Sequence, residues 1–342
     1  MTLPKPVRLG SSGLKISPII VGCMSYGSKA WAPWVLDNEE EIFKVLKHCY
    51  DNGLRTFDTA DFYSNGLSER LVGKFLKRYN INRETVVILT KVFFPVDETL
   101  DLSHGKGMDE ATQLAVANQH GLSRKHILDG VAKSVERLGT YIDVLQIHRF
   151  DTETPVNETM KALNDVVSKG YARYIGASSM LATQFAELQF VAEKHDWFKF
   201  ISSQSCYNLL YREDERELIP FAKRHNIGLI PWSPNARGVL TRPLGTQTLR
   251  HSTDFGLKRI SAFDLQPHEE EIVRRVGEIA EKRGVTMAVV SIAWVLSKGC
   301  YPIVGLSSTE RVDETIKAVE FKLTEEEATY LEEPYKPRAY LS

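Results

Sequence analysis

The chain alternates between short apolar runs of strand length and longer stretches with helical periodicity, and it does so eight times. Runs such as VVILT, DVLQI and PIVGL are almost wholly apolar rather than alternating, which is typical of parallel strands buried on both faces. Eight such units in 342 residues favour a closed (β/α)8 barrel over an open doubly wound sheet. We therefore predict a fold of the α/β class, with a single (β/α)8 barrel domain over residues 1–342.

The predicted elements can be placed by their residue ranges. Strands are expected at 18–23, 55–58, 85–90, 142–148, 173–177, 199–204, 227–232 and 302–306. Helices are expected at 39–52, 67–79, 123–138, 157–169, 182–195, 213–225, 269–282, 286–298, 309–319 and from Thr324 onward. VRLG and LKIS flank the turn at 11–13 and predict an N-terminal hairpin that caps the bottom of the barrel. Two long polar loops, 95–122 after strand three and 235–267 after strand seven, predict lids or binding loops.

Charge and cysteine content narrow the classes of partner. The formal net charge is −1, which indicates neither nucleic acid nor an anionic membrane as a partner. The four cysteines are far apart and form no C-x-x-C or zinc-spaced cluster, so we expect buried reduced thiols, no metal and a cytoplasmic location. No apolar stretch approaches about 20 residues, and the N-terminus lacks the apolar core of a signal peptide. We expect a monomer or weak homodimer.

Three successive predicted strands each end in an ionisable side chain. LRTFDTADFYSNG carries Asp58 at the strand end and Tyr63 in the loop that follows. VVILTK ends in Lys91, and IDVLQIHRF carries His148. In a β/α barrel the carboxyl ends of the strands form the active site, so these side chains are expected to converge. Singly, each has an ordinary explanation as a cap, a solvated strand end or a rim residue, but together they form a proton-transfer set.

Each member of this set has a role in reducing a carbonyl group, which needs a hydride donor and a proton donor. A free tyrosine has a pKa of about 10, and a nearby ammonium group such as that of Lys91 lowers it. Asp58 would hold Lys91 charged and in place. His148 would hydrogen-bond the substrate oxygen or help to move the proton. The predicted catalytic residues are therefore Asp58, Tyr63, Lys91 and His148.

The chain contains neither GxGxxG nor GxxxxGKS/T, so no Rossmann or P-loop nucleotide site is readable. A dinucleotide would have to bind at the later strand ends. Ser178, Ser179 and Gln204 follow strands five and six and could hydrogen-bond a nicotinamide carboxamide. Trp232 ends strand seven and offers a flat face for stacking a ring. Arg311 lies in the first turn of the helix after strand eight, an arrangement that binds phosphate.

The sequence motifs as a whole resemble those of the aldo-keto reductase superfamily. DTADFYSNGLSERLVGKFL and VAKSVERLGTYIDVLQIHRFD resemble the two signatures of that family. VGCMSYGS, YIGASSM and YNLLYREDERELIPFAKRHNIGLIPWSPNARGVLTRP are similar to its fungal aryl-alcohol-dehydrogenase-like branch. The resemblance implies a (β/α)8 barrel that binds NADP(H) without a Rossmann domain and interconverts aldehydes or ketones with alcohols.

The resemblance also implies the residues of the cofactor shell. That shell would comprise Gly22, Met24, Ser178, Gln204, Trp232, Ser233, Pro234, Arg237, Gly238, Ser307, Arg311 and Glu314. Trp232 takes the place of the aromatic that stacks on nicotinamide, and Arg311 that of the residue meeting the 2′-phosphate. Gly305, Thr315 and Asn235 depart from the residues of better-known members, which leaves the strength of the preference for NADPH over NADH open. For the substrate mouth we predict Tyr26, Trp31, Trp34, Phe93 and Arg149.

The predicted function is NADPH-dependent reduction of aryl or small aliphatic aldehydes and ketones, with the proton coming from Tyr63. Two alternatives stay open. Lys91 at a barrel strand end could form a Schiff base, as in barrel aldolases, although Asp58 holding the lysine charged argues against it. The chain could instead be an NADP(H)-binding regulatory subunit without significant turnover, since relatives of this fold serve as accessory subunits of channels. The presence of all four catalytic residues argues against that reading.

Overall fold

The computed structural model describes residues 3–103, 107–246, 253 and 265–341. Within them, eight parallel strands form one sheet in the order β10-β3-β4-β5-β6-β7-β8-β9. The strands are β3 Ile20–Gly22, β4 Thr56–Asp58, β5 Val87–Val92, β6 Ile142–Ile147, β7 Ala172–Ser178, β8 Phe200–Gln204, β9 Gly228–Leu229 and β10 Ile303–Gly305. Each strand overlaps one of the ranges predicted from the apolar runs, so the strand prediction is confirmed.

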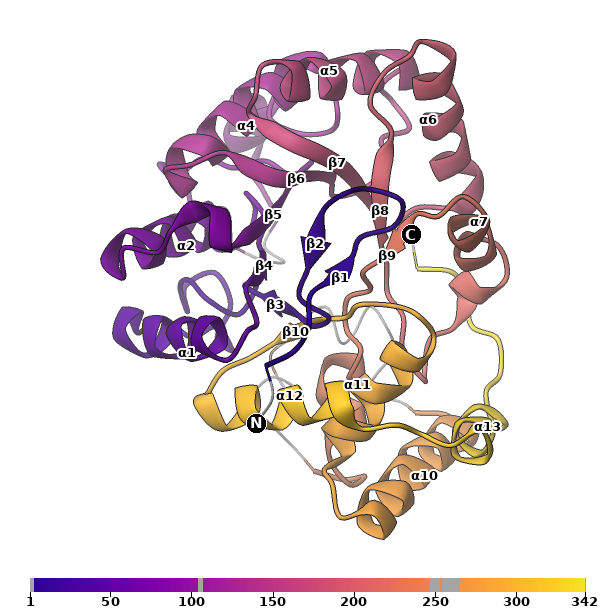
Figure 1. Cartoon of the computed structure of the whole chain (residues 1–342). Helices are drawn as coiled ribbons and strands as arrows, with labels where there is room; N and C mark the ends of the chain where they lie inside the picture. Colours follow the sequence, from indigo (N-terminus) through magenta and orange to yellow (C-terminus); the bar gives the residue numbers. More distant parts are fainter. Residues whose placement is uncertain (1–2, 104–106, 247–252, 254–264, 342) are drawn as a thin grey trace.

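The two edge strands of the sheet meet, and the sheet curls into a barrel. Trp232, which follows β9, forms a parallel bridge with Ile303 of β10. The amides of Tyr301 and Ile303 donate hydrogen bonds of 2.8 Å to the carbonyls of Leu229 and Pro231. Figure 1 shows the strands at the centre of the molecule with the helices around them. The predicted (β/α)8 barrel is confirmed, and it gathers the carboxyl ends of all the parallel strands at one end.

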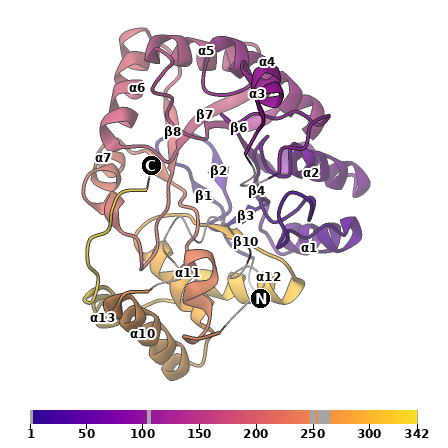
Figure 2. The same cartoon turned by 180° about the vertical axis from the view of Figure 1, so that it is seen from behind.

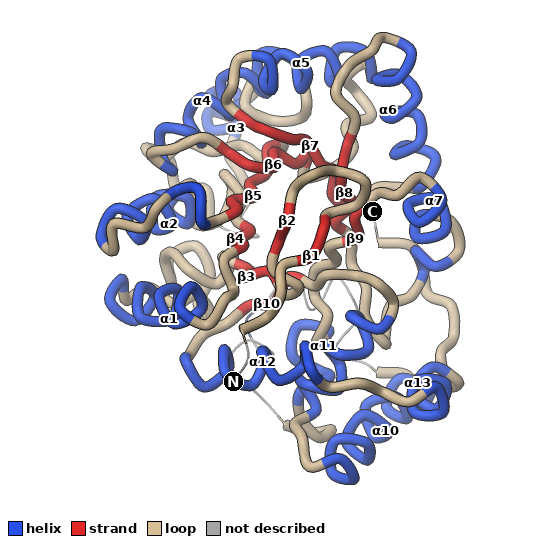
Figure 3. The backbone as a smooth tube through the Cα atoms, in the orientation of Figure 1, coloured by secondary structure: helices blue, strands red, loops and turns tan. Residues whose placement is uncertain are grey.

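Helices alternate with the strands and form the outer layer (Figure 3). They are α1 Glu39–Asp51, α2 Leu67–Arg78, α3 Glu110–Val116, α4 Arg124–Leu138, α5 Val156–Ser168, α6 Ala182–Lys194, α7 Leu218–Arg224, α10 Pro267–Arg283, α11 Met287–Ser297, α12 Thr309–Glu320 and α13 Glu325–Glu332. Short 3-10 segments are η1 Arg83–Thr85, η2 Glu213–Glu215 and η3 Ala236–Thr241. The side chain of Thr324 accepts a hydrogen bond from the Glu327 amide, which is the helix start expected from the sequence.

Two stretches differ from the sequence-based expectation. The expected helix 213–225 is broken into η2 and α7, because Pro220 has no amide hydrogen and fits only the first turn of an α-helix. The expected polar loop 95–122 contains α3, whose N-cap Asp109 accepts from the Thr112 amide at 2.8 Å. Only Val116 of α3 is buried, so the helix has no apolar stripe to reveal it. Residues 104–106 of this loop, and 247–252 and 254–264 of the loop 235–267, lie outside the described residues.

An N-terminal hairpin covers the amino-terminal end of the barrel. Its strands, β1 Val7–Arg8 and β2 Lys15–Ile16, are antiparallel, and in Figure 1 they lie across the centre of the ring of strands. Leu9 and Ile16 are fully buried and pack in one apolar cluster with Leu89 of β5 and other barrel residues. Gly10 has a φ of +58°, and a Cβ there would lie 2.5 Å from the Asn226 carbonyl oxygen. Only glycine therefore permits this close docking.

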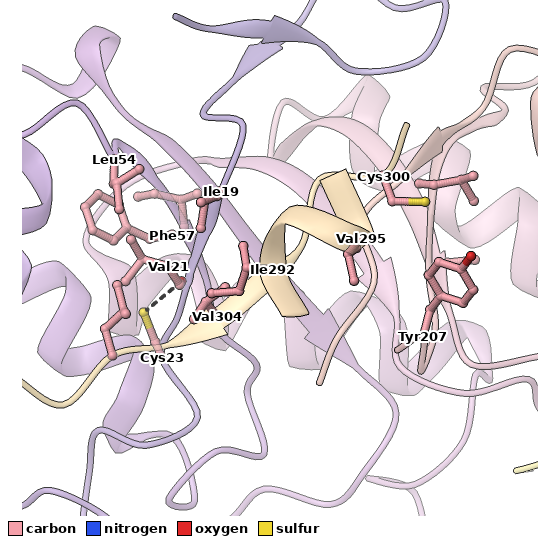
Figure 4. Packing of buried hydrophobic residues seen from close by; sticks show 14 of the residues in the cluster. Ile19, Val21, Cys23, Leu54, Phe57, Tyr207, Ile292, Val295, Cys300 and Val304 are labelled. Carbon is pink, nitrogen blue, oxygen red and sulfur yellow. Dashed lines mark hydrogen bonds between the residues drawn. The ribbon is translucent and has the colours of Figure 1, made fainter. Parts of the chain in front are cut away.

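The main apolar core lies between the barrel strands and the surrounding helices. Figure 4 shows Val21 of β3 and Phe57 of β4 packed together, with Ile292 of α11 beside Val304 of β10. α11 is buried along most of its length, because α12 packs against it. All four cysteines are buried and free, as the sequence predicted. Within the part of the chain that the structure describes, no helix combines the length and the apolar character needed to span a bilayer.

Candidate active site

The carboxyl ends of β4, β5 and β6 bring three ionisable side chains to one end of the barrel. Asp58 is the last residue of β4, Lys91 is the last but one of β5, and His148 directly follows β6. Tyr63 lies in the tight turn after β4, where Ser64 and Asn65 both adopt left-handed backbone angles. This turn folds the tyrosine back toward its own strand end.

Lys91 is the centre of the group. Its side chain is fully buried, and its ammonium donates hydrogen bonds to three oxygens: Asp58 Oδ1 at 2.5 Å, the Thr59 carbonyl at 2.8 Å and Tyr63 Oη at 3.1 Å. An ammonium has three hydrogens, so all of them are engaged. Burial alone would lower the pKa of Lys91, but the Asp58 carboxylate and Tyr63 outweigh burial and raise that pKa above its ordinary value. Lys91 is therefore held charged.

Tyr63 is nearly buried and keeps its proton. Burial raises the pKa of its hydroxyl above the ordinary value, Asp58 raises it further, and Lys91 and Arg149 lower it. The influence of Lys91 on the pKa of Tyr63 has the sign expected from the sequence, but burial is the larger effect. The Tyr63 hydroxyl is thus protonated, and it lies beside the Lys91 ammonium, which can stabilise the phenolate once the proton has left.

His148 completes the proton-transfer group as a neutral ring. Burial lowers the pKa of His148 well below its usual range, and the charges of Arg149 and Lys91 lower it further. The imidazole packs edge-on to the Tyr63 ring, with 5.8 Å between ring centroids. Its Nδ1 is buried and has no hydrogen-bond partner among the residues that the structure describes. A neutral imidazole beside Tyr63 can donate one hydrogen bond to a ligand oxygen without competing for the tyrosine proton.

The second oxygen of Asp58 is held by two amides. The Nε2 atoms of Gln146 and Gln204 donate to Asp58 Oδ2 at 3.0 and 2.9 Å. Nε2 of Gln204 also donates to Oε1 of Gln146 at 2.7 Å. All three side chains are buried at the barrel centre. Asp58 is therefore fixed from both sides, by Lys91 on one oxygen and by the amide pair on the other.

The group opens into a cavity of about 1030 Å³ at the carboxyl-terminal end of the barrel. Asp58, Tyr63 and His148 line this cavity, whereas Lys91 lies behind them. All twelve residues of the predicted cofactor shell line it as well. Figure 2 shows this side of the molecule, with the hairpin at the far end and α3 and the C-terminus nearer the viewer. Proton-transfer residues and predicted cofactor residues thus share one space, which is large enough for two small molecules side by side.

One part of the cavity wall suits an extended anionic ligand. Trp232 presents its ring there, held by a hydrogen bond of 3.1 Å from its Nε1 to Ser179 Oγ. Ala236, Arg237 and Gly238 have consecutive positive φ angles of 45°, 54° and 103°. The amides of Ala236 and Gly238 donate to the carbonyls of Ser233 and Asn235 at 2.9 and 2.8 Å, so they are already engaged. The positive group that this turn adds to the cavity wall is the side chain of Arg237, whose guanidinium lies 5.7 Å from the centre of the Trp232 ring.

Two arginines, Arg242 and Arg311, also line the cavity. Arg311 lies in the first turn of α12, and the Ser308 side chain caps that helix by accepting from the Arg311 amide. Arg242 follows η3, and both burial and the charge of Arg311 lower the pKa of the Arg242 guanidinium. Two positive side chains that line one cavity favour an anionic ligand there. Arg242 was not among the residues predicted from the sequence, since nothing in VLTRP distinguishes it from an ordinary solvated arginine.

The opposite wall is aromatic. Trp31, Trp34, Phe62 and Phe94 line the cavity, and the Trp31 and Phe62 rings pack edge to face at 5.6 Å between centroids. Arg149 lies beside them, with its guanidinium 5.8 Å from the centre of the Phe94 ring. A flat, apolar, electron-rich ligand fits such a wall.

Of the predicted substrate residues, Trp31, Trp34 and Arg149 line the cavity, whereas Tyr26 and Phe93 do not. The Tyr26 hydroxyl donates to the Leu306 carbonyl at 2.5 Å inside the core. Phe93 is buried and packs against Phe94 and His120, because the chain leaves β5 at Val92 and strand alternation ends there. Phe94 occupies the position expected for Phe93.

The described residues include no set of three His, Cys, Asp or Glu side chains placed to hold a metal ion. The polar groups that line the cavity include amides, hydroxyls, arginines, one lysine, one tyrosine, one histidine and the carboxylates of Asp58 and Glu314. They fit an organic ligand with an aromatic ring and anionic groups. They fit a nicotinamide dinucleotide, with Trp232 for the ring and the positive wall for its phosphates.

Comparison with known proteins agrees with this geometry. The aldo/keto reductase family model matches residues 18–336. The chain belongs to the aldo/keto reductase family. It is 67% identical over 338 residues to the "Putative aryl-alcohol dehydrogenase AAD16" of Saccharomyces cerevisiae, covering 99% of each chain. It is 53% identical over 334 residues to versiconal hemiacetal acetate reductase of Aspergillus parasiticus, covering 97% of each.

A further relative is the aldo-keto reductase AMT2 of Alternaria alternata, which is 47% identical over 337 residues, covering 96% of this chain and 91% of the relative. The family resemblance stated from the motifs is thus confirmed. Membership supports an oxidoreductase that acts on carbonyl compounds and uses a nicotinamide cofactor.

Proposed function

We propose that this aldo-keto reductase reduces aldehydes and ketones to alcohols with NADPH, and that Tyr63 donates the proton. The observation that carries the proposal is the hydrogen bond of 3.1 Å from the buried ammonium of Lys91 to the Tyr63 hydroxyl, in a cavity shared with a ring-stacking, arginine-rich wall. When bound, NADPH would supply the hydride. Trp232 would face its nicotinamide, and the side chain of Arg237, which lies beside Trp232 in the cavity wall, would meet its diphosphate.

In this proposal the chain's own residues handle the proton. The carbonyl oxygen of a bound substrate accepts hydrogen bonds from the Tyr63 hydroxyl and from neutral His148, which polarise the carbonyl carbon. As negative charge grows on that oxygen, Tyr63 gives up its proton. Lys91, kept charged by Asp58, then stabilises the phenolate. In the reverse direction the same phenolate accepts the proton of an alcohol.

The Schiff-base alternative conflicts with the state of Lys91. A lysine must lose its proton to attack a carbonyl, and here three acceptors hold that ammonium in its charged form. We therefore propose an acid–base role for Lys91 and no covalent step.

NADPH is proposed over NADH because Arg242 and Arg311 together offer two positive charges at one end of the cavity. A 2′-phosphate carries the charge that such a pair would bind. An aryl substrate is proposed because Trp31, Trp34, Phe62 and Phe94 form the wall beside His148. The name of the putative aryl-alcohol dehydrogenase relative agrees with an aromatic substrate. Four free, buried cysteines support a cytosolic enzyme.

The test is NADPH oxidation followed by absorbance, with benzaldehyde and an aliphatic aldehyde as substrates, in the wild type and in Tyr63→Phe. We expect the variant to lose about 10²–10⁴-fold in kcat, the range that general acid catalysis contributes, while it still binds NADPH. The matched control is Tyr207→Phe, which removes another buried hydroxyl, one that donates to Glu215 outside the cavity. Wild-type turnover that persists in Tyr63→Phe would refute the assigned proton donor. NADPH binding without turnover in the wild type would favour the regulatory subunit.

A further inference from the structure

Gln146 is buried directly behind the active-site cavity and takes no direct part in the proposed proton transfer. It is the last residue but one of β6 and does not line the cavity. Its amide nitrogen donates to Asp58, and its amide oxygen accepts from Gln204, which does line the cavity. Gln146 thus contacts both the residue that holds Lys91 and a residue of the predicted cofactor shell.

Hydrogen-bond accounting fixes how the two amides are turned. A carboxylate can only accept, so Gln146 and Gln204 must both point Nε2 at Asp58 Oδ2. Nε2 of Gln204 has two hydrogens, and the contacts to Asp58 and Gln146 use both of them. Only Oε1 of Gln204 is left to face the cavity. The structure therefore makes Gln204 an acceptor toward any ligand.

We propose that Gln146 is a positioning residue that locks Gln204 as a hydrogen-bond acceptor for the nicotinamide carboxamide and holds Asp58 on Lys91. This inference rests on the proposed function, because the donor that Gln204 would bind is the carboxamide NH2 of the cofactor. Without the acceptor Oε1 of Gln146, one N–H of Gln204 Nε2 loses its partner and becomes available to a ligand, while the other N–H stays on Asp58. Without the donor of Gln146, Asp58 keeps one N–H contact where it had two.

The two roles give two separate signatures in the Gln146→Leu variant. A hydrogen bond to a charged group contributes enough to change a rate about tenfold, so kcat is expected to fall about tenfold. The KM for benzaldehyde should stay within about twofold, because Gln146 does not touch the substrate space. A purely structural defect would not separate kcat from KM in this way.

The second signature uses the reduced 3-acetylpyridine analogue of NADPH, which has a methyl group in place of the carboxamide NH2. The wild type is expected to bind this analogue about tenfold more weakly than NADPH, since Gln204 can only accept. In Gln146→Leu the preference should shrink to about twofold, because the N–H of Gln204 that Gln146 no longer holds can donate to the acetyl oxygen. Binding is measured by quenching of tryptophan fluorescence, without substrate.

Gln189→Leu is the matched control. Gln189 is also a buried amide, and it hydrogen-bonds the amide and the carbonyl of Phe200 on the outside of the barrel. This variant should keep both the wild-type kcat and the wild-type preference between the two nucleotides. If Gln146→Leu does not fold, Gln146→Met replaces it, because methionine fills irregular gaps more easily.

An unchanged nucleotide preference together with an unchanged kcat in Gln146→Leu would overturn the proposal. If the wild type binds neither nucleotide, the proposed NADPH cofactor is refuted, and the hydrogen bond from Gln146 to Asp58 is tested separately. A double-mutant cycle in urea between Gln146→Leu and Asp58→Asn then measures the coupling between the two residues in the free energy of unfolding. A measurable coupling would support the positioning of Asp58 by Gln146, and additive effects would overturn it.

Discussion

Replacing Lys91 with methionine would leave the Asp58 carboxylate buried without its cation. The Lys91 side chain is fully buried and that of Asp58 is 3% exposed, so little water can replace the ammonium. Breaking a buried ion pair from one side costs about 3–5 kcal/mol. An entropy of unfolding of about 2.1 cal/mol/K per residue amounts to about 0.7 kcal/mol/K for a chain of this length. Lys91→Met should therefore lower the Tm by about 4–7 °C.

The loss should depend on pH in a defined direction. In Lys91→Met, the Asp58 carboxylate is buried without a cation, which disfavours its charged form. A carboxyl with a raised pKa in the folded state contributes stability at low pH and loses it as the pH rises through that pKa. The deficit relative to the wild type should thus be smaller near pH 5 than near pH 8. The additional change Asp58→Asn removes the unpaired charge and should restore most of the Tm.

The assay is thermal unfolding followed by circular dichroism at both pH values. Lys125→Met serves as the control, because Lys125 pairs with Asp129 on the exposed surface of α4 and such pairs contribute at most about 1 kcal/mol. A Tm for Lys91→Met equal to that of the wild type at both pH values would refute the assignment of a buried ion pair. A double variant no more stable than the single one would do so as well.

Two further predictions concern Arg242 in the cavity wall and the buried residue Asp214. Arg242→Ala should weaken NADPH binding about tenfold and leave NADH binding unchanged, measured by fluorescence titration; equal losses for both nucleotides would contradict the proposed phosphate contact. Burial raises the pKa of Asp214 to about 6, so its charged form destabilises the fold as pH rises through that value. Asp214→Asn should therefore raise the Tm more at about pH 8 than at about pH 5. The same gain at both pH values would contradict this.

The strand ends were predictable because nearly continuous apolar runs indicate the strands of a parallel sheet. The runs VVILT and DVLQI, which end near Lys91 and His148, are almost wholly apolar, as is typical of strands covered on both sides. Once the strands are parallel, their carboxyl ends lie together, so Asp58, Lys91 and His148 converge whatever the loops do.

Other features depend on contacts that no local pattern reports. Gln146 lies within an apolar run, and only the closed barrel shows that its amide reaches Asp58 and Gln204. Arg242 is a candidate phosphate-binding residue only because Arg311, which is far away in the sequence, acts on it electrostatically in the fold. We predicted Phe93 for the substrate mouth, but Phe94 lines the cavity, because the exact residue at which β5 ends decides which ring faces it.

The central claim is that this cavity moves hydride from NADPH to a carbonyl carbon while Tyr63 supplies the proton. The most direct measurement is a single turnover with NADPH deuterated at C4 of the nicotinamide and with benzaldehyde, followed by mass spectrometry of the alcohol. The account predicts deuterium on the alcohol carbon from one of the two C4 faces, and almost no labelled alcohol from Tyr63→Phe in the same time. Benzyl alcohol that forms without deuterium from either face, or labelled alcohol formed equally fast by Tyr63→Phe, would contradict it.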